Sequence, residues 1–162
     1  ADKFNAKTRL SLICHNMYKF PSELTIIDEE RSAFLEQYIP VALNLEFDDR
    51  YRNASNALWC HRMHFRPAIQ LSVLWGGIES LFLIEKSIKK NLSIAASRFI
   101  YGDDRMANNI RELYESRCKA VHEFKNADAE IKDSSAKLLH QLIISCVERN
   151  CLPDVSQLLK NQ

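Results

Sequence analysis

Helix-breaking residues are scarce in this sequence, which has only 3 glycines and 4 prolines among 162 residues. Strand-rich folds use such residues at many short turns, so their scarcity favours helices joined by few connections. The hydrophobic fraction of 46% and the charged fraction of 27% are those of an ordinary globular domain. The length suits one domain with a sizeable core. We therefore expect an all-α helical bundle in a single domain.

An excess of one charge sign is also lacking, because the formal net charge is +1 at pH 7. No strong overall field therefore draws the chain to nucleic acid or to an anionic membrane, and RNA binding would need a local basic patch. No apolar run reaches transmembrane length, and the first residues lack the basic-then-apolar pattern of a signal peptide. We expect a cytoplasmic protein without membrane association. Because the chain starts with Ala1 and not methionine, it is also consistent with a fragment of a longer protein.

Cysteine pairs of the CxxC type are absent as well. The five cysteines are Cys14, Cys60, Cys118, Cys146 and Cys151. Their odd number and scattered positions indicate reduced thiols in a cytosolic protein, not a disulfide framework. Cys60, His61 and His64 lie close together, but zinc needs three or four ligands in a defined geometry and no second cluster follows. We therefore favour incidental cysteine and histidine over a metal site, and we expect no metal and no cofactor.

The spacing of the apolar residues predicts a series of helices. The expected helices are residues 10–20, 28–39, 58–64, 66–84, 93–101, 104–124, one that begins near residue 128, and a short one after Pro153. Pro21 and Pro40 are expected to end the first two helices. Gly102 is expected to cap the C-terminus of residues 93–101. The polar residues 46–56 predict a loop or a frayed helix start.

Residues 66–84 form the most apolar segment, with apolar side chains all round the predicted helix. Such a helix is expected to lie at the centre of the bundle, buried on most sides. Gly76 and Gly77 in its middle lower the helix propensity. The expected compensation is the close approach of another helix, in the same chain or across a dimer.

One residue does not fit the pattern of the helix at 104–124. At about 100° per residue, Arg117 falls near the centre of the apolar stripe of that helix. Burying an unpaired guanidinium would be costly, so Arg117 either pairs with a carboxylate or lines a pocket for an anion. Glu79 is the only charged residue between positions 69 and 84 of the central helix. We hypothesise that Glu79 orients Arg117 through a charge-assisted hydrogen bond, with a purely structural buried ion pair as the alternative.

These residues carry a resemblance to a known family. The segment LYESRCKAVH, from Leu113 to His122, resembles the R-x4-6-H signature of HEPN domains, and more closely the LYxxRxxxVH form of the Apea-like branch. Upstream, residues 78–82 resemble the acidic helix of that branch. Arg9 and His15 also satisfy the bare pattern, but they have no preceding LY and no acidic helix upstream, so we interpret them as a coincidence. The resemblance covers residues from 66 to the end of the last long helix.

The resemblance implies a HEPN-like helical bundle, with an up-and-down core of about four helices at 57–150, an N-terminal helical extension at 1–56 and a tail at 151–162. It also implies a homodimer with the motif near the subunit interface. Many members are metal-independent endoribonucleases of toxin, antiviral or RNA-processing systems, so the implied partners are RNA, a second copy, and an antitoxin or further domains.

The implied roles can be assigned to single residues. His122 would be the general acid or base, and Arg117 would bind the scissile phosphate, in a reaction that leaves a 2′,3′-cyclic phosphate. The supporting residues would be Glu79 and Cys118. The candidate contacts to other RNA phosphates are Arg111, Lys119 and Lys125. His122 lies five residues after Arg117, about 140° further round the helix, so the two do not stack on one face.

The sequence departs from the active members at two positions. Cys118 stands where they often have Asn, Asp, His or Ser, and Glu123 stands where a small residue is common. A thiol is a weak hydrogen-bonding substitute, which favours an alternative function as a non-catalytic dimerisation or nucleotide-binding module. The basic run at Lys86, Lys89 and Lys90 is predicted to lie at the end of the central helix, where cations interact favourably with the helix dipole. Guidance of RNA phosphates toward Arg117 is the alternative for this run.

Overall fold

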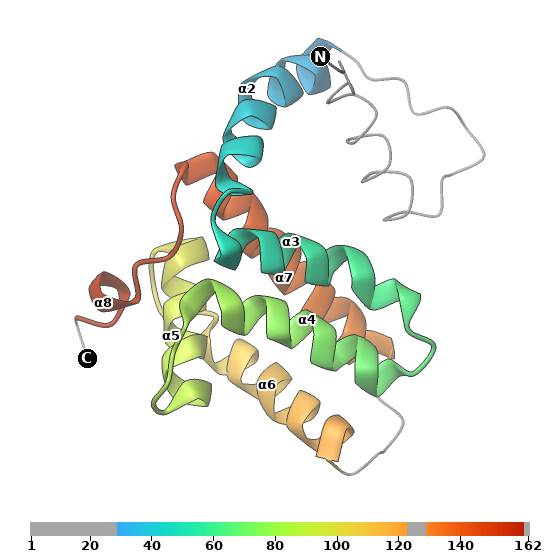
Figure 1. Cartoon of the computed structure of the whole chain (residues 1–162). Helices are drawn as coiled ribbons and strands as arrows, with labels where there is room; N and C mark the ends of the chain where they lie inside the picture. Colours follow the sequence, from blue (N-terminus) through green and yellow to red (C-terminus); the bar gives the residue numbers. More distant parts are fainter. Residues whose placement is uncertain (1–28, 123–128, 161–162) are drawn as a thin grey trace. The chain divides into compact units, whose positions relative to one another are not determined.

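A computed structural model describes residues 29–122 and 129–160, and these residues form helices and no β-strand (Figure 1). The helices are α2 (Glu29–Leu45), α3 (Asp49–Cys60), a 3-10 turn (His61–Met63), α4 (Pro67–Phe82), α5 (Ile88–Tyr101), α6 (Ala107–His122), α7 (Ala129–Arg149) and α8 (Val155–Leu158). The predicted all-α class is therefore confirmed. The chain divides after Gln37 into two units, and the second holds the bundle from α3 to α8. No helix in the described ranges is long and apolar enough to cross a membrane.

Helix α2 corrects one sequence prediction, because it passes through Pro40 and ends at Leu45. A proline inside a helix removes one backbone hydrogen bond, here the bond that would reach the carbonyl of Glu36. The side chain of Pro40 is exposed, so water can donate a hydrogen bond to the unpaired carbonyl and the helix can continue. The helix predicted at residues 10–20 lies outside the described residues.

Helix α3 corrects another, because the loop or frayed helix start predicted at residues 46–56 is limited to the turn at 46–48 and the helix begins at Asp49. Asp48 caps the helix, and its side chain accepts a hydrogen bond from the backbone N–H of Arg50 at 2.8 Å. Tyr51 and Ala54 are buried one turn apart, whereas most of the polar residues between them and after them face solvent. The buried stripe of α3 is narrow and rich in alanine, so a scan for large apolar residues overlooks it. The boundary expected between residues 56 and 57 falls inside this helix.

Helix α4 is the centre of the bundle, as predicted. It lies between α3 and α6 and also packs against α7 (Figure 1). Its fully buried side chains are Leu71, Leu74, Trp75, Ile78 and Leu81. The helix ends at Phe82, two residues earlier than expected, because Leu83 adopts a left-handed conformation with φ of 49°. The N–H of Leu83 bonds to the carbonyl of Glu79 and closes the last turn.

The two glycines of α4 have different environments. A Cβ atom added at Gly77 would lie 2.5 Å from the Cβ of Ala57 and 3.2 Å from a methyl of Leu139. Gly77 therefore allows α3 to approach α4 closely, and the close approach expected from the sequence occurs within one chain. A Cβ at Gly76 would meet nothing within 4 Å.

The segment between α4 and α5 overturns the prediction for the lysine run. Lys89 and Lys90 lie in the first turn of α5, which begins at Ile88, and Lys86 precedes that helix. The C-terminal dipole of α4 therefore does not explain these cations. Gly102 caps the other end of α5 with φ of 81°, as expected.

The observed positions of the last three helices agree more closely with those predicted from the sequence. Helix α6 begins at Ala107, slightly later than predicted, because Asp103 and Asp104 accept hydrogen bonds within the preceding turn. Helix α7 has the predicted stripe, of which Leu138, Leu139, Leu142, Ile143, Cys146 and Val147 are buried. The short helix after Pro153 is α8, and the side chain of Asp154 caps it.

Candidate functional site

The site is built on Trp75, which α4 presents to both α6 and α7. The indole Nε1 of Trp75 donates a hydrogen bond of 3.1 Å to Oγ of Ser135 on α7, so the buried polar group is satisfied. The ring of Tyr114 on α6 packs edge-to-face against Trp75, with the ring centroids 5.1 Å apart. The ring contact packs α6, the helix that carries the Arg117 motif, against the core.

Arg117 extends from α6 over the ring of Tyr114. Its guanidinium carbon lies 5.5 Å from the centroid of the Tyr114 ring, and its Nη2 lies 3.7 Å from Oε1 of Glu79 on α4. The Arg117 side chain is 19% exposed and that of Glu79 is 34% exposed. The pairing predicted between these residues is therefore present as an ion pair, but 3.7 Å is too long for the charge-assisted hydrogen bond.

Most hydrogen-bond donors of Arg117 have no strong partner among the described residues. Within the described residues, its buried Nε has no hydrogen-bond partner, and its Nη1 has a weak contact of 3.9 Å with Sγ of Cys118. An arginine carries five N–H donors in a planar fork that matches the oxygens of phosphate or carboxylate. Packing thus holds this guanidinium in place, and most of its donors make no strong hydrogen bond to the described residues.

The negative charge of Glu79 acts on Tyr114 as well as on Arg117. Burial, and after it the charge of Glu79, raises the pKa of the Tyr114 hydroxyl. Tyr114 therefore stays a neutral phenol at physiological pH. Its chemical contribution to the site is an aromatic face and a hydroxyl, not an anion.

Two predicted site residues lie wholly or partly outside the described residues. His122 is the last residue of α6, but its side chain is outside the described part of the structure, and Lys125 lies in the segment 123–128, which is also outside it. Because Arg117 and His122 belong to one continuous helix, their Cα positions differ by about 140° round its axis. The predicted convergence of Arg117 and His122 stays a prediction.

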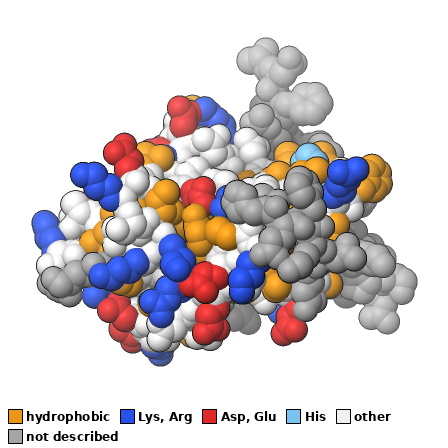
Figure 2. Space-filling model, turned by 90° about the horizontal axis from the view of Figure 1, so that it is seen from below, with side chains coloured by type: hydrophobic (Ala, Val, Ile, Leu, Met, Phe, Trp, Pro, Cys, Tyr) orange, Lys and Arg blue, Asp and Glu red, His pale blue; other side chains and the backbone are white. Residues whose placement is uncertain are grey.

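The other candidate phosphate contacts lie away from Arg117. Arg111 and Lys119 are exposed, and at about 100° per residue they stand about 120° and 160° round α6 from Arg117. Arg111 bonds to Asn108 on the same helix, and Glu115 between them pairs with Lys89 of α5 at 2.9 Å. On the face seen in Figure 2, acidic and basic side chains are interspersed, so the visible described surface does not form one continuous basic patch.

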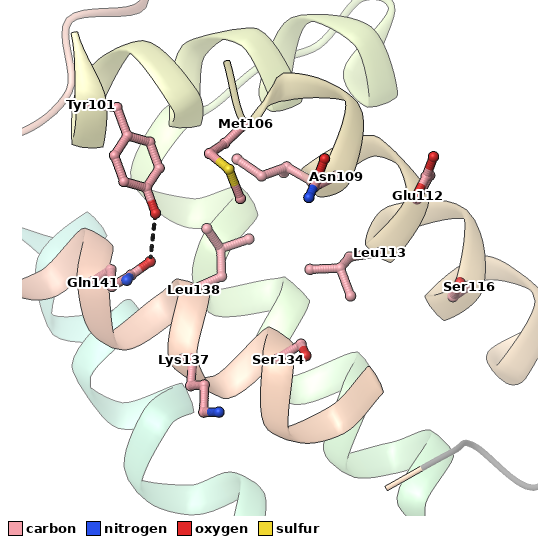
Figure 3. Close-up of a pocket in the computed structure, with 11 residues that line it drawn as sticks. Tyr101, Met106, Asn109, Glu112, Leu113, Ser116, Ser134, Lys137, Leu138 and Gln141 are labelled. Carbon is pink, nitrogen blue, oxygen red and sulfur yellow. Dashed lines mark hydrogen bonds between the residues drawn. The ribbon is translucent and has the colours of Figure 1, made fainter. Parts of the chain in front are cut away.

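An open groove beside α6 was not predicted from the sequence. Its volume is about 490 Å³, and it lies between the end of α5, α6 and α7 (Figure 3). Leu113 and Leu138 supply apolar walls, while the hydroxyl of Tyr101 donates to Gln141 at its rim over 3.2 Å. Arg117 does not line it. Leu113 therefore lines this groove, whereas its neighbour Tyr114 packs against Trp75 and Arg117. The order of residues in the motif does not show this difference.

The cluster at Cys60, His61 and His64 has an ordinary structural explanation. His61 is buried, and its Nδ1 lies 2.7 Å from the carbonyl of Leu58, to which it donates as a neutral ring. Burial lowers the pKa of His61. Within the described ranges, no group of three or more His, Cys, Asp or Glu side chains is placed to hold a metal ion.

Comparison with known proteins adds no relative. No protein-family model, curated protein or solved structure matches this chain. The resemblance to HEPN domains therefore depends on the residues quoted above.

Proposed function

We propose that the chain is a cytoplasmic, metal-independent endoribonuclease domain of the HEPN type that acts as a homodimer on RNA. The observation that carries the proposal is the state of Arg117. Tyr114 and Glu79 hold its guanidinium in position, yet among the described residues its Nε has no hydrogen-bond partner and its Nη1 has only a weak contact with Cys118. An oriented cation with unused donors suits a phosphate, and the charge that builds on that phosphate in the transition state.

The proposed reaction is an internal transfer at phosphorus. A base removes the proton of the ribose 2′-hydroxyl, whose oxygen attacks the adjacent phosphorus and forms a new P–O bond. The bond from phosphorus to the 5′-oxygen breaks, and an acid returns a proton to that oxygen. The products are a 2′,3′-cyclic phosphate and a free 5′-hydroxyl. In the proposal His122 supplies the acid or the base, because imidazole titrates near neutral pH.

A second copy completes the proposed site. Since Arg117 and His122 are about 140° apart round α6, one helix does not present both on a single face. Two copies of α6 would supply two histidines, one neutral and one protonated, as the two proton transfers require. The dimer is thus part of the proposed mechanism.

The test is cleavage of total tRNA and mRNA in excess EDTA by the wild type, Arg117→Ala and His122→Ala. Cleavage by the wild type alone, with cyclic phosphate ends, is the expected result. Arg52→Ala and His64→Ala are the matched controls, since Arg52 is exposed on α3, which α4 separates from α6 (Figure 1). Circular dichroism and sedimentation check that each variant keeps its helices and its oligomeric state. Full cleavage by His122→Ala would refute the assignment.

A non-catalytic nucleotide-binding module is the second candidate. It is favoured by Cys118, whose thiol replaces the polar group usual after the arginine, and by Glu79, whose charge already offsets that of Arg117. This function predicts no cleavage of any RNA, together with a rise in Tm on adding nucleotides. The rise should disappear in Arg117→Ala and persist in Arg52→Ala.

A further inference from the structure

The turn that ends α7 joins the backbones of two cysteines. The N–H of Asn150 bonds to the carbonyl of Val147 at 3.1 Å, and the N–H of Cys151 bonds to the carbonyl of Cys146 at 3.1 Å. Asn150 itself is left-handed, with φ of 50°. This pair of bonds defines a Schellman motif. In this motif one bond spans five residues, and the side chains of the two residues that it joins frequently contact each other. Those two residues are Cys146 and Cys151.

The two thiols differ in access to solvent. Cys146 is fully buried, whereas Cys151 is exposed, and both are free thiols. Burial is the main reason that the pKa of Cys146 is raised to about 12, and the charge of Cys151 is the second. Cys151 is therefore the thiol that meets a dissolved oxidant first, and Cys146 is positioned as its intramolecular partner.

We propose that Cys146 and Cys151 form a modification site at which a hydroperoxide produces an intrachain disulfide. The thiolate of Cys151 attacks a peroxide oxygen, so an S–O bond forms, the O–O bond breaks, and water or an alcohol leaves after protonation. Sulfur of Cys146 then attacks the sulfenic sulfur of Cys151, forming the S–S bond. The sulfenic oxygen leaves as water with the proton of Cys146. The sum consumes one peroxide and two thiol hydrogens.

Oxidation changes the core as well as the surface. Cys146 is fully buried on α7, which packs against α3 and α4, so the disulfide would include a sulfur of the core. The closed loop contains only the residues from 146 to 151, and short loops restrict the unfolded chain little. We therefore expect no rise in Tm, in contrast to a structural disulfide that closes a long loop.

The experiment uses the folded full chain and does not depend on ribonuclease activity. The protein is treated with an equimolar amount of hydrogen peroxide, blocked with an alkylating agent and digested with trypsin without reduction. Because trypsin cleaves after Arg149, it separates Cys146 from Cys151. The expected product is peptide 138–149 joined to peptide 150–160, lighter by two hydrogens than the two peptides together, and released by a reducing agent.

Variants make the outcome decisive. Cys151→Ser, a change at an exposed position, should keep the fold and abolish the joined peptides, whereas Cys60→Ser and Cys118→Ser should leave them unchanged. Cys146→Ser should leave Cys151 as a sulfenic acid that a dimedone probe captures. Recovery of Cys151 as sulfinic acid in the wild type, or joined to a cysteine of a second molecule, would overturn the proposal.

Discussion

Gly77 of α4 and Ala57 of α3 lie so close that a Cβ atom at Gly77 would stand 2.5 Å from the Cβ of Ala57. Real Cβ atoms do not approach to this distance, so the contact requires glycine at one of the two positions. Gly76, its neighbour in sequence, is exposed and meets nothing. Two adjacent glycines in one helix thus form a matched pair for experiment.

We expect Gly77→Ala to destabilise the fold by about 1–3 kcal/mol, because α3 and α4 would have to separate. Gly76→Ala should instead stabilise it by about 0.5–1 kcal/mol, since alanine is the better helix former at an exposed position. Urea unfolding monitored by circular dichroism measures both. Equal effects of the two substitutions would contradict the close approach of α3.

Ser135→Ala should cost about 1–3 kcal/mol, because it leaves the buried indole N–H of Trp75 without its acceptor. Ser134→Ala is the control, since Ser134 lies at the open groove and is half-buried. The fluorescence of Trp75 should shift in the first variant and not in the second. If Ser135→Ala left the stability unchanged, water would have replaced the hydroxyl as the acceptor for the indole N–H.

The Arg117–Glu79 pair should contribute little to stability, because both side chains are partly exposed and their atoms are 3.7 Å apart. A double-mutant cycle with Arg117→Met and Glu79→Gln should give a coupling energy of about 0.5–1 kcal/mol. Thermal or urea unfolding of the four proteins provides the measurement. A coupling near 3 kcal/mol or more, as for fully buried pairs, would instead favour a purely structural role.

Stability should fall as the pH drops below about 6.5, the usual pKa of histidine in an unfolded chain. Burial lowers the pKa of both His61 and His140, so the unfolded state binds protons that the folded state does not. The stabilisation is complete above that pH and is lost as the pH falls toward the lowered folded values. Tm should therefore be lower at pH 5.5 than at pH 7.5.

The double variant His61→Asn, His140→Gln tests the cause of this pH dependence. Asparagine at position 61 retains a donor for the carbonyl of Leu58, which His61 contacts at 2.7 Å. The difference in Tm between the two pH values should shrink in this variant. A difference of the same size as in the wild type would assign the effect to other groups.

Arg98 should hold the C-terminal helix in place, because its Nη1 donates to the carbonyl of Leu158 at 2.6 Å and its Nη2 to Asp104 at 2.9 Å. In Arg98→Ala, the amides of residues 155–160 should exchange with solvent faster, while those of α7 should not change. Hydrogen exchange with mass spectrometry reads both segments. Arg105→Ala serves as the control, since Arg105 is exposed and pairs with Asp103 in the preceding turn.

The sequence by itself determined the helical class, the central position of α4 and the buried stripe of α7. Each depends on the spacing of large apolar side chains along one helix, a property that does not require a partner. The conflict at Arg117 was also visible, because a charge on an apolar stripe must be compensated wherever the helix packs. Glu79 could be named as the partner because no other charge lies between positions 69 and 84 of α4.

Tertiary structure alone decided the rest. Helix α3 forms because Ala54 and Ala57 fit against Gly77. Small side chains such as these produce no clear apolar pattern in the sequence. Helix α2 continues past Pro40 because that residue faces solvent, which the local sequence does not reveal. The 3.7 Å separation of Arg117 and Glu79, and the turn that joins Cys146 to Cys151, depend on how helices pack and end in space. Periodicity describes one helix at a time, whereas these features arise where two segments meet.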